Sequence, residues 1–184
     1  VWVSGATGYT GKALVRLLSE MGVYVVGHIR PNSPSLEASR TLFESQGVVS
    51  RVIPWEKKAL VNAIQSDSIT HVFGLLGTTA KKGRKARSRG EVVNYQTIDL
   101  GLTSMLLESC LEVTTCQRFI YLSAIGVSKS SRSPYMKARW EAEEMIRSSD
   151  MAYTIGQPSL ITGPDREESR PMEDLAALDQ TSAM

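Results

Sequence analysis

Short apolar runs alternate with longer segments of helical periodicity along this chain. The runs are rich in Val and Ile and do not alternate with polar residues, which is typical of strands buried on both faces. The longer segments space apolar residues three and four positions apart, as between Leu14 and Met21. The predicted strands are 1–5, 23–29, 48–53, 70–77, 118–124 and 152–161, and the predicted helices are 9–22, 34–47, 55–65, 92–110 and 134–149.

This order of elements predicts the fold class α/β, a doubly wound parallel sheet with right-handed crossovers, that is, a Rossmann fold. No internal repeat or long linker divides the sequence, so we expect one domain over residues 1–184. The polar segment 164–184 lacks a seventh strand and is expected to be partly irregular, with the C-terminal part short or incomplete. The first residues lack Met and a basic segment, so we expect them to lie inside a strand, with further residues upstream.

The composition, 42% hydrophobic and 22% charged, is ordinary for a globular protein, and no apolar run suggests a membrane span. The net charge of +2 hides a basic segment, 80–90, without which fifteen basic residues face nineteen acidic ones. That segment could serve nuclear import or nucleic-acid binding, but it has no aromatic residues to stack on bases. A solvated loop at the rim of a ligand site is the simpler interpretation, and a contact with a partner or a substrate phosphate is the alternative.

Two cysteines, Cys110 and Cys116, fit neither a CxxC motif nor a zinc-ligand pattern, and His28 and His71 lie far from them in sequence. We therefore predict two free thiols in a reducing compartment and no metal site. The cytoplasm is the expected location, with the nucleus or an organelle left open.

A glycine-rich turn, Gly5, Gly8 and Gly11, follows the first strand and opens the first helix. In this context Gly5 permits a tight turn, Gly8 lets the backbone approach a pyrophosphate, and Gly11 lets the helix pack on the strand. The helix N-terminus favours anions, and Thr7 and Thr10 can add hydroxyl donors. The alternative is a glycine turn that binds no ligand.

Arg30 stands at the end of the second strand, where NAD-binding sites often carry an acidic residue for the ribose 2′-hydroxyl. A guanidinium there can instead pair with a 2′-phosphate, which favours NADP(H) over NAD(H). A solvated surface cation is the alternative interpretation of Arg30.

Ser123 ends a predicted strand, and Tyr135 and Arg139 follow it on one face of a helix that begins at Pro134, with Ser133 as the N-cap. Hydride addition to a carbonyl leaves an alkoxide that needs a proton, and a tyrosine near a cation can supply it. Ser123 could orient the carbonyl. The alternative is an ordinary helix tyrosine and a strand-end serine.

Four segments, "SGATGYTGKALV", "GLLGTT", "YLSAIGVSKSSRSPYMKARWEAE" and "PSLITGPDREESRP", occur in an order that resembles the atypical short-chain dehydrogenase/reductases. The Tat-interacting-protein-like oxidoreductases are the nearest group, and NmrA-like proteins are more distant. The resemblance implies a Rossmann fold, NADP(H) binding and, in several members, weak catalysis with regulatory roles. The residues it assigns to the cofactor are Gly5, Thr7, Gly8, Tyr9, Thr10, Gly11, Arg30, Leu76, Gly77, Thr78, Tyr135, Arg139, Pro158 and Ser159.

Three departures from the family pattern bear on function. Arg139 replaces a lysine, Gln157 replaces a frequent arginine, and Pro54 and Trp55 stand where an acidic residue often meets the adenine. Arginine supplies charge but never releases its proton. We therefore expect an NADP-dependent oxidoreductase of unknown small-molecule substrate, with Ser123, Tyr135 and Arg139 as its catalytic set. The alternative is a weak or inactive NADP(H)-binding regulatory or scaffold protein that acts through a protein partner.

Overall fold

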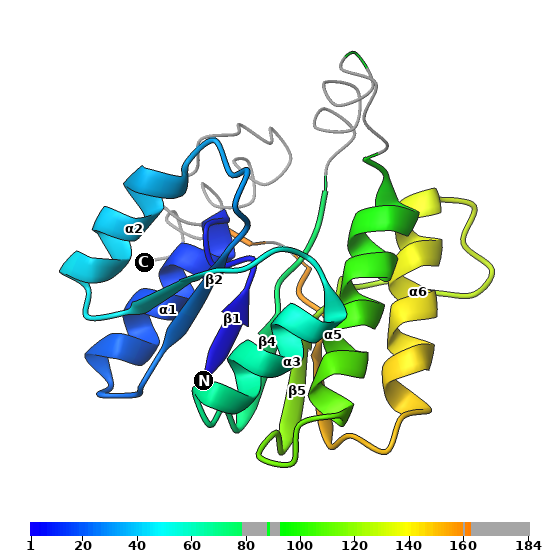
Figure 1. The fold of residues 1–184 in the computed structure, drawn as a ribbon. Helices are drawn as coiled ribbons and strands as arrows, with labels where there is room; N and C mark the ends of the chain where they lie inside the picture. Colours follow the sequence, from blue (N-terminus) through cyan, green and yellow to red (C-terminus); the bar gives the residue numbers. More distant parts are fainter. Residues whose placement is uncertain (79–87, 89–92, 160, 163–184) are drawn as a thin grey trace, which may run out of the picture.

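The computed structural model describes residues 1–78, 88, 93–159 and 161–162 (Figure 1). The strands are β1 (Trp2–Ser4), β2 (Val26–Ile29), β3 (Val49–Val52), β4 (His71–Gly74), β5 (Arg118–Leu122) and β6 (Tyr153–Gly156). The helices are α1 (Tyr9–Glu20), α2 (Leu36–Ser45), α3 (Lys57–Ser66), η1 (Gln96–Gly101), α5 (Leu102–Leu111) and α6 (Pro134–Arg147).

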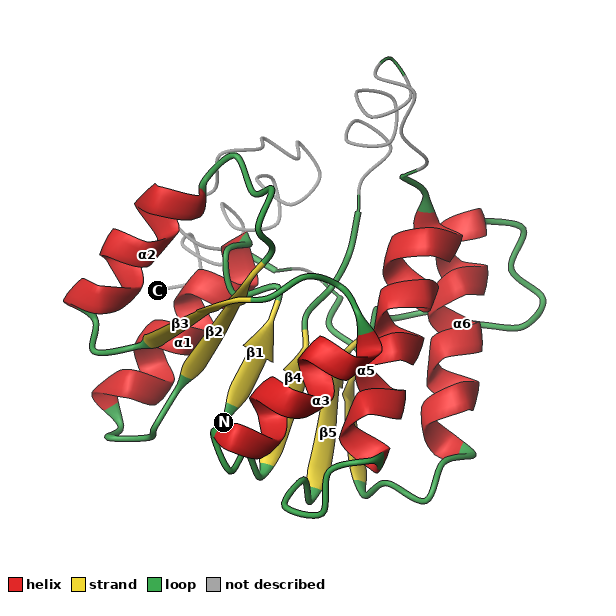
Figure 2. Cartoon of the chain, in the orientation of Figure 1, coloured by secondary structure: helices red, strands yellow, loops and turns green. Residues whose placement is uncertain are grey.

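The strands form one parallel sheet in the order β3-β2-β1-β4-β5-β6 (Figure 2). Trp2 of β1 pairs with Val26 on one side and with Val72 on the other, so the strand order reverses direction between β1 and β4. This is the strand order of a doubly wound sheet, so the predicted fold class is confirmed.

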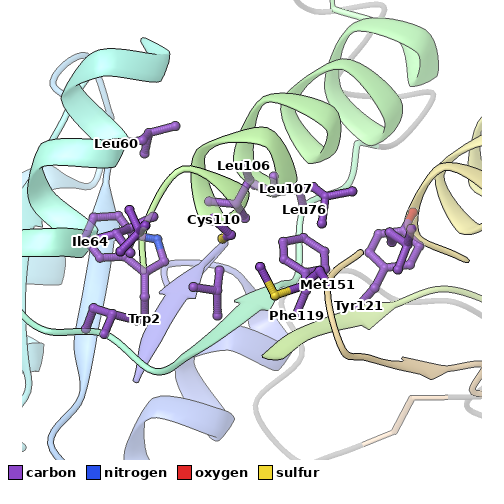
Figure 3. Packing of buried hydrophobic residues seen from close by; sticks show 14 of the residues in the cluster. Trp2, Leu60, Ile64, Leu76, Leu106, Leu107, Cys110, Phe119, Tyr121 and Met151 are labelled. Carbon is purple, nitrogen blue, oxygen red and sulfur yellow. The ribbon is translucent and has the colours of Figure 1, made fainter. Parts of the chain in front are cut away.

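Helices cover both faces of the sheet and bury two hydrophobic clusters. One cluster joins the sheet to α3, α5 and α6, and Figure 3 shows Leu106, Leu107 and Cys110 of α5 among its side chains. The other cluster joins the sheet to α1 and α2 through Val15 and Phe43. Because buried residues lie on both faces, the strands lack the polar alternation of an exposed sheet.

The predicted helix 92–110 differs most from the structure. It consists of the π-helix η1 followed by α5, and the final predicted strand ends at Gly156. The hydroxyl of Thr103 donates to the backbone carbonyl of Asp99 at 2.7 Å, which satisfies a carbonyl where the helix changes winding. Short π-helical segments often occur at functional sites, so Asp99, which lies in η1, is a candidate functional residue.

The basic segment 81–89 and the polar segment 164–184 lie outside the described residues, apart from Ser88, so their predicted roles stay predictions. Cys110 and Cys116 are free, as predicted. Among the described helices, none is long and apolar enough to cross a membrane. Within the same part of the chain, no three His, Cys, Asp or Glu side chains gather closely enough to hold a metal ion.

Candidate functional site

The glycine turn after β1 is held tightly against the end of β4. Gly5 has a φ of +84°, and a Cβ there would lie 2.6 Å from the carbonyl oxygen of Leu75. A Cβ on the buried Gly11 would lie 2.1 Å from the oxygen of Gly5. Both positions therefore require glycine, for the turn and for close helix packing respectively, as the sequence predicted.

The N-terminus of α1 faces this turn. Gly8 is its exposed N-cap and provides no side-chain cap, and its backbone N–H donates to the Gly5 carbonyl at 3.0 Å. Thr7, Tyr9 and Thr10 are half-buried beside it. A helix end without a capping side chain suits an anionic group, since its first backbone amides and the helix dipole both favour negative charge.

The segments that follow β1 and β4 lie together at the point where the strand order reverses. The amide of Leu75 donates to the Ser4 carbonyl at 3.0 Å, which places residues 76–78 beside the glycine turn. In open parallel sheets, ligands bind in the crevice at this reversal. Arg30 is exposed directly after β2, on the next strand of the same edge.

An aromatic side chain after β3 packs against β2. Trp55 packs edge-on to the ring of His28 at a centroid distance of 4.7 Å, and His28 stacks on Trp2 at 5.4 Å. Burial lowers the pKa of His28, although its contact with the Ile53 carbonyl opposes that shift. Trp2, His28 and Trp55 thus form one aromatic group across β1, β2 and the segment after β3.

Arg139 is buried on α6 and binds groups from several elements. Its Nη1 donates to the hydroxyl of Tyr121 at 3.0 Å and to the carbonyl of Leu122, and its Nη2 donates to the Leu76 carbonyl at 3.0 Å. Burial disfavours the charge, but Tyr121, Tyr135 and Asp99 outweigh it and raise the pKa of Arg139. The guanidinium thus joins α6 to the ends of β4 and β5.

Asp99 of η1 completes this cluster. Its carboxylate lies 2.9 Å from Nη2 of Arg139 and accepts the amide proton of Thr78 at 3.0 Å. The side chain is fully buried, and that burial raises its pKa to about 6 despite the nearby guanidinium and amide. The same environment raises the pKa of Tyr121 to about 12, with burial as the largest cause.

Some polar atoms of this cluster have no hydrogen-bond partner. In the described part of the chain, Thr78 Oγ1 and Arg139 Nε are buried without one, and Asp99 Oδ1 has only its ion pair with Arg139. A Cβ on the exposed Gly77 would lie 2.7 Å from Nη2 of Arg139, so a side chain there would require the guanidinium to shift. Together with the Gly5–Gly11 turn, these features fit a dinucleotide.

Tyr135 lies in the first turn of α6, as predicted. Ser133 caps the helix by accepting the amide of Met136 at 3.5 Å. The half-buried ring of Tyr135 lies 5.3 Å from the guanidinium carbon of Arg139 and 5.4 Å from the ring of Tyr95, edge to face. The structure thus brings Tyr135 and Arg139 together.

Ser123 is buried and belongs to a second polar cluster. Its hydroxyl donates to Oε1 of Glu143, which also accepts from Gln157 Nε2 at 2.8 Å. Arg147 donates to Oε2 of Glu143 at 2.6 Å. Among the contacts of the described residues, none joins Ser123 to Tyr135. The single hydroxyl proton of Ser123 is therefore directed at a carboxylate.

The remaining predicted cofactor residues lie at the end of β6. Pro158 accepts the amide of Ile125 at 3.0 Å, which ties this segment to the one after β5, and Ser159 is exposed beside it. Sequence reasoning missed Asp99, Glu143 and Tyr121. For Glu143 the available signal was its position four residues after Arg139, on the same face of the helix.

Comparison with known proteins is consistent with this geometry. Residues 5–183 match a protein family described as NAD(P)H-binding. The chain is 28% identical over 178 residues to the mitochondrial protein fmp52-1 of Aspergillus terreus, covering 94% of this chain and 70% of that one. It is 26% identical over 164 residues to the mitochondrial NADH dehydrogenase [ubiquinone] 1 alpha subcomplex subunit 9 of Arabidopsis thaliana, covering 89% of this chain and 38% of that subunit.

Solved structures share the fold at low sequence identity. A Burkholderia cenocepacia J2315 protein assigned as an epimerase superposes with a TM-score of 0.70 at 17% identity, over 99% of this chain and 61% of its own. ChuY, an anaerobillin reductase from Escherichia coli O157:H7, superposes with a TM-score of 0.65 at 16% identity, over 99% and 89%. Since the family match spans nearly the whole chain, we conclude that the chain belongs to the NAD(P)H-binding family.

Proposed function

We propose that this chain binds NADP(H) and interconverts a carbonyl and an alcohol, as an atypical short-chain dehydrogenase/reductase of the Tat-interacting-protein-like group. The observation that carries the proposal is the pairing of Tyr135 with the Arg139 guanidinium at the ligand-binding edge of the sheet. A tyrosine beside a fixed positive charge is suited to exchange a proton with a reacting oxygen.

The cofactor would lie across the reversal in strand order. The turn between Gly5 and Gly11 would hold the pyrophosphate, and Arg30 would pair with the 2′-phosphate. Residues 76–78 and 158–159 would line the two nucleoside ends of the crevice. When bound, the nicotinamide supplies or accepts the hydride.

Tyr135 would give the proton to the substrate oxygen, and Arg139 would stabilise the resulting phenolate through its charge. Arg139 remains protonated throughout, so the proton lost by Tyr135 must be replaced from solvent or another group. Ser123 can accept a hydrogen bond from the substrate while its own proton is directed at Glu143. It therefore suits an alcohol substrate better than a carbonyl in this arrangement.

The test is Tyr135→Phe, assayed for NADPH oxidation against a panel of aldehydes and ketones. We expect loss of turnover by at least about a hundred-fold with NADPH affinity nearly unchanged, because only the proton donor is removed. Tyr153→Phe, on the exposed edge strand β6, is the matched control. Equal turnover in Tyr135→Phe and wild type would remove Tyr135 from the mechanism.

A second candidate function, NADP(H) binding with little or no turnover, is favoured by the contacts of Arg139 and Ser123. The guanidinium already binds Tyr121, Leu76, Leu122 and Asp99, and the serine proton is directed at a carboxylate. The similarity to a named subunit of NADH dehydrogenase supports action through a protein partner. Tight NADPH binding without oxidation by any carbonyl in the panel would support this function over the first.

The cellular compartment also belongs to this proposal. Free Cys110 and Cys116 favour a reducing compartment, and two relatives carry mitochondrial names. We therefore extend the expected location from the cytoplasm to the mitochondrial interior. Fractionation of cells that express the natural full-length protein, tagged at its C-terminus, would decide between the two.

A further inference from the structure

Asp99 contacts two parts of the site that lie far apart in the sequence, the segment after β4 and the helix α6. Its carboxylate accepts the amide of Thr78, in the segment that follows β4, and it pairs with Arg139 on the helix that carries Tyr135. Arg139 also donates a hydrogen bond to the Leu76 carbonyl of the same segment. One buried carboxylate thus contacts both the proposed cofactor-binding edge and the proposed catalytic helix.

The fold buries Asp99 completely, and burying a carboxylate costs free energy. The π-helix η1 presents it fully buried, and Gly77 lies beside it, where even a Cβ would lie 3.4 Å from Asp99 Oδ1. A buried carboxylate loses its hydration, and donors that face it recover part of that free energy. Here the partners are an amide and a guanidinium, both donors, which favour the ionised form.

We infer that Asp99 is a positioning residue whose negative charge holds residues 76–78 against α6, so that acid loosens the cofactor-binding edge. The inference rests on the proposed function, because the 76–78 segment matters only if NADP(H) binds there. It assigns the site a pH-dependent cofactor affinity that no recognised motif in the sequence encodes.

The groups that face Asp99 agree with a transition in mildly acidic solution. Arg139 of α6 and the amide of Thr78 favour its charge, Tyr121 of β5 stays neutral, and Tyr135 lies beyond the guanidinium. Burial outweighs the two donors and raises the pKa of Asp99 to about 6. Below that pH the carboxyl group is neutral, so its ion pair with Arg139 is lost and the hydrogen bond from the Thr78 amide weakens.

The first test follows the Thr78 amide proton by NMR in the free protein between about pH 5 and about pH 7.5. We expect its chemical shift to follow one transition near pH 6 in wild type and to stay flat in Asp99→Asn, because only an ionisable acceptor responds there. A flat Thr78 shift in wild type would overturn the inference. This readout needs no cofactor, so it is independent of whether the proposed function is correct.

The second test is calorimetric titration with NADPH at the same two pH values. We expect wild-type affinity to fall about five-fold more than that of Asp99→Asn on acidification, since a hydrogen bond to a charged group is stronger by about that factor. A cofactor phosphate also titrates in this range, but it does so equally in both proteins. Asp150→Asn, on the exposed turn after α6, is the matched control and should behave as wild type.

The calorimetric results distinguish failure of the inference from failure of the proposed function. Parallel pH profiles in wild type and Asp99→Asn would contradict the inference while leaving the proposed function intact. Absence of NADPH binding at either pH would instead overturn the proposed function and the affinity part of the inference together. If Asp99→Asn does not fold, because Arg139 is left unpaired, Asp99→Asn with Arg139→Gln removes both charges and should show the same flat profile.

Discussion

At the scale of single residues, two glycines with left-handed backbone differ in what a side chain would meet. Gly5 has a φ of +84° and faces the Leu75 backbone, whereas Gly22 has a φ of +74° with nothing within 4 Å. The first position is therefore constrained by both conformation and space, and the second by conformation alone. Comparing Gly5 with Gly22 therefore separates the effect of backbone strain from the effect of steric contact with the Leu75 backbone.

We predict that Gly5→Ala lowers the free energy of unfolding by more than about 2 kcal/mol, because strain and a backbone clash add. Gly22→Ala should cost only about 1 kcal/mol, the strain alone. Urea denaturation measures both. NADPH affinity should be lost in Gly5→Ala and kept in Gly22→Ala, and equal losses of stability would show that the turn tolerates a side chain.

Residues with a local signal were the ones that sequence reasoning could place. The glycine turn, the cap at Ser133 and the spacing of Tyr135 and Arg139 follow from short-range rules, and the structure agrees with each. Asp99 was not found, because its partners lie at sequence separations of 21 and 40 residues. Such contacts depend on tertiary packing that no local pattern reports.

At the scale of elements, α6 carries both polar clusters of the site on one face. Arg139 and Glu143 are four residues apart and both are buried, with Ala138 and Ala142 beside them. The small alanines leave room for two charged side chains against the sheet. The helix thus positions Tyr135 through the ionic contacts of its later turns as well as through apolar packing.

We predict that Glu143→Gln destabilises the fold by about 2 kcal/mol, because three hydrogen bonds lose their charged acceptor. Glu37→Gln is the control: its side chain is 80% exposed and pairs with Arg40, so its loss should cost under about 1 kcal/mol. Guanidinium denaturation compares the two. A smaller effect in Glu143→Gln than in Glu37→Gln would mean that the buried carboxylate contributes little.

The buried carboxyl group of Asp99, on η1, determines how the free energy of unfolding should depend on pH. The pKa of Asp99 is about 6 in the fold and near 3.8 in the unfolded chain, so this group favours folding most in acid and that contribution is lost as pH rises through 6. Between about pH 5 and about pH 7.5 the loss is about 1.4 kcal/mol. Denaturation at both pH values should show it in wild type but not in Asp99→Asn, and equal pH dependence in the two would contradict it.

The π-helical winding of η1 could not be predicted from the sequence. Apolar spacing predicts a helix over 92–110 but does not distinguish α from π winding, since one wider turn shifts the pattern by a single residue. The strands were easier to predict because each is a short apolar run between turn residues. Their pairing then follows from the rules for parallel sheets.

At the scale of the whole molecule, the six-stranded sheet and its two helical layers place the glycine turn, residues 76–78 and the start of α6 at one edge. That arrangement supports dinucleotide binding more firmly than any particular reaction, because related folds include both an epimerase assignment and a reductase. The chain spans 38% of the Arabidopsis subunit, so that protein's assembly enters only as a proposal for this one.

The central claim, that this fold binds NADP(H) through the glycine turn and Arg30, is tested most directly by calorimetric titration with NADPH and NADH. We predict tighter binding of NADPH, and loss of about ten-fold in NADPH affinity alone in Arg30→Ala, because the guanidinium pairs with the 2′-phosphate. Arg40→Ala, on the exposed face of α2, should behave as wild type. Binding of neither dinucleotide would contradict the claim, and equal binding of both, unchanged in Arg30→Ala, would contradict the role of Arg30.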